Sequence, residues 1–340
     1  MKILIRAPNW IGDCVMAGPA VSSLKHNFPE AEIWITARDW VAGLFLNHEG
    51  VSGILPLPSF SGIKGLRSAA RLLEKNRFDA GFLLTNSFHS ALLFALAKIP
   101  QRWGYRTDGR GFLLTRSVQR PRWDDPAHHI FYYLDLLAGL GFKTLKPRLS
   151  LSRPRRETAL LRERLSRRGW DGKAPLVLLN PGAQYGPAKR WPAERFRATA
   201  RGIIKEREVF FAITGSAAEI PLAEEIAAGI NPRPVVLAGQ TSLEELLAVI
   251  GLSRLFITND SGPMHIANAL GTPLVALFGP TDHRLTGPFQ QPSTLIRHEA
   301  PCWPCLNRVC PFDHRCMLDI PPEDVLKKCL NLLNSNQNHV

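Results

Sequence analysis

The feature that most constrains the fold of this chain is a repeated alternation of short apolar runs with amphipathic stretches. In the first half, the apolar runs predict strands at 2–6, 31–36 and 79–84. The same alternation begins again after residue 174, where apolar runs predict strands at 175–180, 209–215, 235–239, 255–260 and 273–279. Strands that alternate with helical segments favour a parallel sheet covered by helices on both faces.

A polar and basic stretch at 150–174 separates the two halves. Because 340 residues exceed what one core usually holds, two domains are expected. We predict two doubly wound α/β domains, at 1–165 and 166–322, that face each other across a cleft. A final helix and tail at 323–340 are expected to pack back toward the first domain. In open sheets of this kind, ligands bind at the carboxyl ends of the strands.

The chain offers no membrane span, because no apolar run approaches the ~18 residues needed to cross a bilayer. The apolar run near the N-terminus stops at Arg6 and is typical of a strand, not of a signal peptide. A cytoplasmic location is therefore expected. The formal net charge of +13 indicates anionic partners, and nucleic acid, anionic lipid headgroups and acidic sugars would all fit.

The positive charge is concentrated in one part of the first half. Six arginines and a single acid, Asp108, fall within 102–122. The candidate anion-binding residues in this stretch are Arg102, Arg106, Arg110 and Arg120. The alternative for each of them is a solvated basic face that binds nothing.

The loop after the predicted strand 175–180 has features of a phosphate-binding loop. It reads PGAQYGPAKRWP over 181–192 and leads directly into a predicted helix. A glycine-bearing turn between strand and helix presents free N–H groups to an anion, and Lys189 adds a compact positive charge. Gln184 and Tyr185 of the same loop are further candidates for binding a donor molecule. The alternative is a long surface connection with a Lys-Arg pair.

A second loop of this kind follows the predicted strand 255–260. Asp260, Ser261 and Gly262 form a turn at the start of a predicted helix, and His265 lies one turn into it. The helix dipole and the unpaired N–H groups of a first turn attract phosphate. The alternative is an ordinary helix cap with a packed histidine. Two such loops at neighbouring strand ends favour diphosphate binding, and Glu219, at a third strand–helix junction, is a weaker candidate for contacting a ribose.

Asp13 is the candidate general base of the first domain. It follows the first predicted strand in the stretch PNWIGD, at the start of a predicted helix. A carboxylate there could take the proton from an attacking hydroxyl, which is worth roughly 10²–10⁴-fold in rate. The alternative is a helix N-cap worth ~1 kcal/mol.

These segments together resemble a known family. APNWIGD at 7–13, PGAQYGPAKRWP at 181–192 and TNDSGPMHIANALGTPLVALFGPTD at 258–282 are similar to the ADP-heptose:lipopolysaccharide heptosyltransferases of glycosyltransferase family 9, which have the GT-B fold. The resemblance covers nearly the whole chain in the same order. The stretches GPAKRWP at 186–192 and NSFHSALL at 86–93 are most similar to the heptosyltransferase II branch of this family.

The resemblance implies an inverting transfer of L-glycero-D-manno-heptose from ADP-heptose to the first inner-core heptose on Kdo-lipid A, with no required cofactor. It implies that Asp13 is the catalytic base and that Lys189 contacts the diphosphate. It also assigns Asp260, Ser261, Gly262 and His265 to the donor site. Asn86 and the arginine stretch would then bind the anionic acceptor and hold a monomeric enzyme at the inner face of the inner membrane.

Four cysteines depart from the best-known members of that family. Cys302, Cys305, Cys310 and Cys316 have the spacing C-x2-C-x4-C-x5-C. Four thiolates this close in sequence could hold a structural zinc ion or an iron–sulfur cluster. Redox-sensitive disulfides and free structural thiols are the alternatives, although a reducing cytosol disfavours disulfides.

Rival functions fit the sequence less well. A GT-B sugar-nucleotide epimerase would use the same donor loops but would not need the arginine stretch. A dinucleotide-dependent dehydrogenase is disfavoured because the first strand–helix turn contains no GxGxxG. A nucleic-acid-binding protein would explain the pI of about 9.8 but not the two phosphate loops. Within the resembling family, heptosyltransferases I and III remain alternatives.

Overall fold

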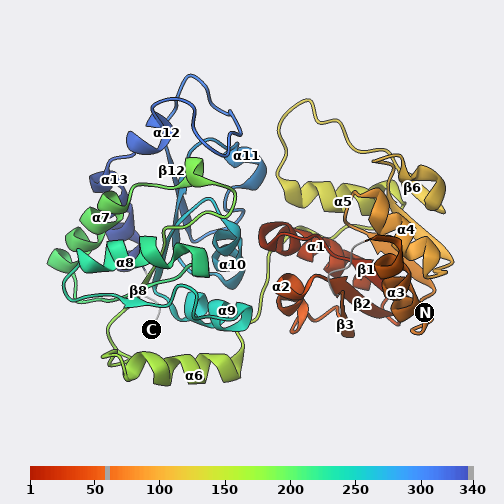
Figure 1. The fold of residues 1–340 in the computed structure, drawn as a ribbon, viewed down its shortest axis with the longest axis horizontal. Coiled ribbons are helices and arrows are strands. Elements are labelled where there is room, and N and C mark those ends of the chain that lie inside the picture. The colour runs from red at the N-terminus through yellow and green to blue at the C-terminus, as the bar shows by residue number, and fades with distance from the viewer. Residues whose placement is uncertain (58–61, 336–340) are drawn as a thin grey trace. The chain divides into compact units, whose positions relative to one another are not determined.

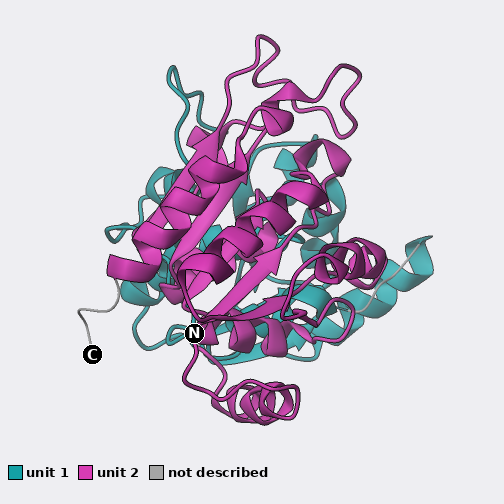
Figure 2. Cartoon of the chain, turned by 90° about the vertical axis from the view of Figure 1, so that its left-hand side faces the viewer, with its two compact units in different colours: residues 1–152 teal, residues 153–340 magenta. Residues whose placement is uncertain are grey.

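The computed structural model describes residues 1–57 and 62–335 of the chain. The chain divides into two compact units, the first ending at Ser152 and the second beginning at Arg153 (Figure 2). The division falls before the helix α6 (Arg155–Ser166), which the sequence assigns to the first domain. This helix packs against α9 (Leu243–Leu252) and therefore belongs to the second unit.

Within residues 1–57 and 62–152, six strands form one parallel sheet in the order β3-β2-β1-β4-β5-β6. The strands are β1 (Lys2–Arg6), β2 (Glu32–Ala37), β3 (Gly53–Pro56), β4 (Ala80–Leu83), β5 (Gln101–Tyr105) and β6 (Arg116–Val118). The helices between them are α1 (Ile11–Asn27), α2 (Asp39–Ala42), α3 (Gly62–Glu74) and α4 (Phe88–Leu96), and α5 (His129–Gly139) follows the last strand. Helix α1 packs against α5 and α3 against α4, and together they cover the sheet (Figure 1).

Within residues 153–335, six further strands form a second parallel sheet in the order β12-β11-β10-β7-β8-β9. The strands are β7 (Leu176–Asn180), β8 (Phe210–Ile213), β9 (Val235–Val236), β10 (Leu255–Asn259), β11 (Leu274–Phe278) and β12 (Ser293–Arg297). The remaining helices are α7 (Ala193–Glu206), α8 (Ile220–Ala228), α10 (Gly262–Leu270), α11 (His283–Thr286), α12 (Arg315–Leu318) and α13 (Pro322–Ser335).

Both sheets have the same topology. Numbered within its own unit, each sheet has the strand order 3-2-1-4-5-6. The strand order therefore reverses between β1 and β4 in the first unit, and between β7 and β10 in the second. The crevice at such a reversal, at the carboxyl ends of the strands, is where doubly wound folds bind their ligands. The predicted α/β class and the doubly wound build of both domains are thus confirmed.

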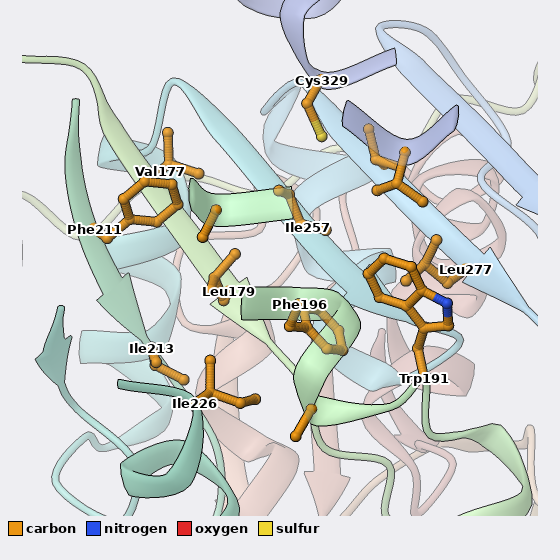
Figure 3. Packing of buried hydrophobic residues seen from close by; sticks show 14 of the residues in the cluster. Val177, Leu179, Trp191, Phe196, Phe211, Ile213, Ile226, Ile257, Leu277 and Cys329 are labelled. Atoms are coloured by element: carbon orange, nitrogen blue, oxygen red, sulfur yellow. The ribbon is translucent and has the colours of Figure 1, made fainter. Parts of the chain in front are cut away.

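The core of the second unit explains why its elements form where they do. Strands β7, β10 and β11 are buried along their whole length, as expected for a sheet covered on both faces. One apolar cluster joins them to α7, α8 and α13; Val177, Leu179, Trp191, Phe196, Ile257 and Cys329 are among its members (Figure 3). Helix α13 contributes three buried side chains, Val325, Cys329 and Leu333, to this cluster. The last helix therefore packs in the second unit, although the sequence suggested packing toward the first.

Helix α9 shows how closely local sequence can set an element. Ser242 is its N-cap and accepts a hydrogen bond from the Glu245 backbone N–H, while the Glu245 carboxylate accepts from the Ser242 N–H. This reciprocal capping box leaves two first-turn donors satisfied. The serine and the acids that follow it thus set the start of this helix.

Candidate functional site

The second unit's switch point carries a buried ion pair. The loop after β7 brings the Lys189 Nζ to 2.5 Å from the Asp260 Oδ2, at the end of β10. The Thr281 hydroxyl, after β11, donates to the same carboxylate oxygen at 2.5 Å. The Lys189 and Asp260 side chains are only 11% and 5% exposed. Two predicted donor-site residues from separate loops therefore lie in direct contact, and a lysine ammonium is held at the carboxyl edge of the sheet.

A set of amide and hydroxyl groups locks the two loops together. The Asn180 side-chain amide donates to the hydroxyls of Thr258 and Ser261 at 2.9 and 3.0 Å. The Asn259 amide donates to the Pro181 carbonyl at 2.7 Å, and its oxygen accepts from the Trp191 N–H at 3.1 Å. The loop 181–192 is therefore fixed to the end of β10 from both sides. The sequence did not single out Asn180.

The start of α10 is not closed by a side-chain cap. Ser261 is the N-cap residue, but among the described residues its side chain makes no capping hydrogen bond and instead pairs with Asn180 and Thr258. The Asp260 carboxylate is likewise occupied by Lys189 and Thr281. The helix that begins at Gly262 thus keeps its dipole available to an anion at this end. His265 is buried in the first turn of the same helix.

Tyr185 is part of the loop 181–192, and Glu219 contacts that loop from the segment after β8. The Tyr185 hydroxyl donates to the Leu306 carbonyl at 2.5 Å, and the Lys189 Nζ lies 4.6 Å from the centre of the Tyr185 ring. The Glu219 carboxylate accepts from the Ser216 N–H at 2.7 Å. A Cβ at Gly182 would lie 1.9 Å from the Glu219 Oε1, so a side chain there would displace the carboxylate. Gln184 is exposed on the loop.

In the first unit, Asp13 lies on the first turn of α1, after β1. The N-cap of this helix is Trp10, so Asp13 is not its cap. Its carboxylate accepts a hydrogen bond from the Tyr133 hydroxyl, and the charge of His129 acts on it. Burial raises the pKa of Asp13, while the nearby His129 and the hydrogen bond from Tyr133 lower it in part. A carboxylate with a raised pKa is a stronger base than an exposed one.

The sequence missed both partners of Asp13. His129 and Tyr133 lie on α5, which packs against α1. Their spacing of four residues places them on one face of that helix. Burial lowers the pKa of His129, and the nearby Asp13 carboxylate opposes part of that shift. The dense aromatic and histidine run at 128–133 was the available signal.

The residues predicted to bind an acceptor fall into two groups. The Asn86 side-chain oxygen, after β4, accepts from the Tyr132 hydroxyl at 2.9 Å, and the Arg120 guanidinium lies 5.6 Å from the centre of the Tyr132 ring. Arg106 and Arg120 are exposed. These two arginines and Asn86 are therefore available to a ligand of the first unit.

Arg110 and Arg102 are instead engaged by the protein itself. Arg110 is completely buried and donates to the carbonyls of Tyr105 and Thr85 at 3.0 and 2.5 Å. The Arg102 guanidinium donates to the Leu113 and Ile99 carbonyls at 2.7 and 2.6 Å. Arg110 donates to oxygen atoms of the protein interior, which indicates a structural role, and its predicted acceptor contact stays a prediction.

The cysteines are all free thiols within the described part of the chain, which includes every one of them. No group of three or more histidine, cysteine or acidic side chains in residues 1–57 and 62–335 is arranged to hold a metal ion. The four cysteines predicted as ligands are thus not preassembled around one point. In the same residues, no helix combines the length and the apolar character needed to cross a membrane.

Comparison with known proteins agrees with this arrangement. The model of glycosyltransferase family 9 (heptosyltransferase) matches residues 66–315. The lipopolysaccharide heptosyltransferase 2 of Salmonella typhimurium is 32% identical to the chain, with 98% of this chain and 99% of that protein covered.

Solved structures give the same result. Escherichia coli ADP-heptose lipopolysaccharide heptosyltransferase II superposes with a TM-score of 0.85 at 30% identity, over 99% of this chain and 100% of that one. A family 9 glycosyltransferase from Veillonella parvula, at 22% identity, has a TM-score of 0.87 over 98% of both chains and shares the fold. The chain therefore belongs to glycosyltransferase family 9, the heptosyltransferases, has the GT-B fold, and is most like heptosyltransferase 2.

Proposed function

We propose that this enzyme transfers L-glycero-D-manno-heptose from ADP-heptose, with inversion, to the first heptose of the inner core on Kdo-lipid A. The observation that carries the proposal is Asp13, a partly buried carboxylate at the switch point of the first unit with a raised pKa. The donor assignment is supported by the similarity to the Escherichia coli ADP-heptose lipopolysaccharide heptosyltransferase II.

The reaction divides between the two switch points. The acceptor hydroxyl attacks the anomeric carbon of the heptose from the face opposite the diphosphate, and its proton passes to the Asp13 carboxylate. The bond from the anomeric carbon to the diphosphate oxygen breaks, and ADP leaves with that electron pair. Tyr133 holds the carboxylate in place through its hydrogen bond. General-base help of this kind accelerates transfer by roughly 10²–10⁴-fold.

The second unit stabilises the leaving group. Negative charge develops on the diphosphate as its bond to the sugar breaks. Lys189 and the N-terminus of α10 supply fixed positive charge at the carboxyl edge of the sheet. Asp260 and Thr281 hold the lysine ammonium in place before the donor binds. Gln184, Tyr185, Glu219, Ser261 and His265 are the further residues that we assign to the donor. The mechanism requires no cofactor.

The proposed acceptor is anionic, and exposed arginine side chains of the first unit could bind it. Arg106 and Arg120 are exposed, and Asn86 lies at the end of β4 beside Tyr132. We assign these three residues to acceptor binding. The same cations would attract the negative surface of the inner membrane, each contributing about 1 kcal/mol near such a surface. A peripheral, monomeric enzyme on the cytoplasmic side is therefore proposed.

A transfer assay tests the proposal. Purified protein is given ADP-heptose together with Kdo-lipid A that carries either no heptose or one. Addition only to the one-heptose acceptor is the expected result. Addition to the heptose-free acceptor would assign heptosyltransferase I activity, and addition only to a longer core would assign heptosyltransferase III activity. Turnover with a different nucleotide sugar but not with ADP-heptose would reject the proposed donor.

A further inference from the structure

The proposed function leaves the four clustered cysteines unexplained. They lie in the segment 302–316, called here the cysteine segment, which follows β12 and runs into α12. The remaining cysteines, Cys14 and Cys329, are buried in helices elsewhere. Exposure falls along the segment, from exposed Cys302 to buried Cys316.

All four of these cysteines line one small cavity. Its volume of about 20 Å³ is room for a single water molecule or ion. His314 and Ala188 line the same cavity, so that it lies between the cysteine segment and the loop that carries Lys189.

The cysteine segment supports the Lys189 loop directly. The Ala188 N–H donates to the Arg308 carbonyl at 3.1 Å, and the His314 Nε2 lies 2.8 Å from the Ala188 carbonyl oxygen. A Cβ at Gly186 would lie 2.3 Å from the Arg308 carbonyl oxygen, so the two backbones approach as closely as glycine permits. The loop that presents Lys189 therefore rests on the cysteine segment.

The segment also supports the second partner of the ion pair. The Trp303 indole N–H donates to the Thr281 carbonyl at 3.0 Å, and the Leu306 N–H donates to the Pro280 carbonyl at 3.0 Å. Thr281 is the residue whose hydroxyl donates to Asp260. One irregular segment thus supports both loops that fix the Lys189–Asp260 pair.

We propose that the cysteine segment binds one thiophilic metal ion, Zn²⁺ or Fe²⁺, through Cys302, Cys305, Cys310 and Cys316, and that the ion stiffens the support of the donor loops. Four sulfur ligands are the usual set of a closed structural site. Because no three of these groups are already arranged around one point in the described residues, the thiol side chains must turn into the cavity as the ion binds. Each thiol releases its proton on binding, so that loading depends on pH.

Metal analysis of the full-length protein tests the binding. The chain is produced in medium with zinc and iron salts, and bound metal is measured by elemental analysis after gel filtration. One ion per chain is expected in the wild type and in Cys329→Ser, which removes a buried thiol of the same unit outside the cavity. The double variant Cys302→Ser/Cys305→Ser should lose the ion, and Zn²⁺ or Fe²⁺ is identified by the element found.

Thiol titration in denaturant separates the remaining outcomes. A metal-free wild type with all six thiols reactive would overturn the proposal in favour of free structural thiols. A metal-free wild type with fewer reactive thiols would overturn it in favour of a disulfide. Retention of the ion by the double variant would also overturn it. If that variant does not fold, Cd²⁺ titration of the wild type gives the answer, since thiolate-bound cadmium has its own ultraviolet absorption.

The supporting role of the ion rests on the proposed function and needs a separate measurement. Removal of the ion by a chelator should weaken ADP-heptose binding about tenfold, the effect of loosening one charge-assisted hydrogen bond, and reloading should restore it. Unchanged affinity after removal would overturn the supporting role. No ADP-heptose binding in either state would instead count against the proposed donor, and the metal content would stand on its own.

Discussion

The two units share one topology and differ in the chemistry at its switch point. In the first unit, a carboxylate lies beside a phenol and an imidazole after β1. In the second, a lysine, an aspartate and a threonine meet at the ends of β7, β10 and β11. The strand order fixes where a ligand binds, and the loops decide what is bound. Under the proposed function, the first site accepts a proton and the second holds an anion.

The largest effect is expected from the base of the first unit. Asp13→Asn removes the proton acceptor and should lower the transfer rate by roughly 10²–10⁴-fold. Single-turnover transfer with saturating ADP-heptose measures this rate. Asp39→Asn, which changes an exposed aspartate of the same unit, is the matched control and should transfer at the wild-type rate. If Asp13→Asn turned over at nearly the wild-type rate, Asp13 would not be the base, and the proposed difference in role between the two sites would be wrong.

The buried pair of the second unit should affect both stability and rate. Lys189→Ala leaves Asp260 buried without its cation, which should cost about 3–5 kcal/mol of stability, and should lower kcat by roughly 10²–10³-fold. Lys189→Met/Asp260→Asn should recover most of the stability and none of the activity. Urea unfolding and steady-state kinetics measure the two effects, with exposed Lys205→Ala as control. Recovered activity in the double variant would show that the pair is only structural.

Tyr133 should affect the pH profile of the first site. Burial raises the pKa of Asp13, and the hydrogen bond from Tyr133 opposes that rise. Tyr133→Phe should therefore raise the pKa further and move the acid limb of kcat/KM to higher pH. At pH values below the pKa of Asp13, kcat/KM should fall roughly tenfold, as for one lost hydrogen bond to a charged group. This difference from the wild type should shrink as the pH rises.

The neighbouring tyrosine is the control for this profile. The Tyr132 hydroxyl donates to Asn86 and not to Asp13. Tyr132→Phe should leave the acid limb where it is. Superimposable acid limbs for the wild type and Tyr133→Phe would mean that Tyr133 does not position the base.

The smallest effect is expected for an exposed arginine of the first unit. Arg120→Ala should raise the acceptor KM about threefold, as expected for one exposed ion pair, and the effect should fade with added salt. The donor KM should not change. Exposed Lys75→Ala is the matched control. An equal rise in the acceptor KM for both variants would show that only the overall charge matters.

The parts of the fold that the sequence predicted are the strands buried on both faces. The apolar runs of β1, β7, β10 and β11 stand out because a covered parallel sheet needs them. Strands β3, β5, β6 and β12 were not predicted. Strands β3 and β6 have only four and three residues, and β5 and β6 overlap the arginine-rich stretch, where their pairing partners are set by the sheet and not by local composition.

The residues of the candidate site likewise fall into those that the sequence could predict and those that it could not. Asp13, Lys189 and Asp260 follow apolar strands, so that their place at a sheet edge could be read from spacing alone. His129 and Tyr133 come from a helix more than a hundred residues later and reach Asp13 only through the packing of α5 on α1. The burial of Arg110 could not be predicted either, because charge alone does not distinguish a solvated arginine from one that donates to interior carbonyls.

The division of labour between the two units is tested most directly by donor affinity. ADP-heptose binding is measured by calorimetry for the wild type, Asp13→Asn and Lys189→Met/Asp260→Asn. The expected result is wild-type affinity in Asp13→Asn, which transfers heptose much more slowly, and affinity at least tenfold weaker in the double variant, the loss of about 1.4 kcal/mol. A loss of donor affinity in Asp13→Asn equal to that in the double variant would contradict the assignment of proton transfer to the first unit and donor binding to the second.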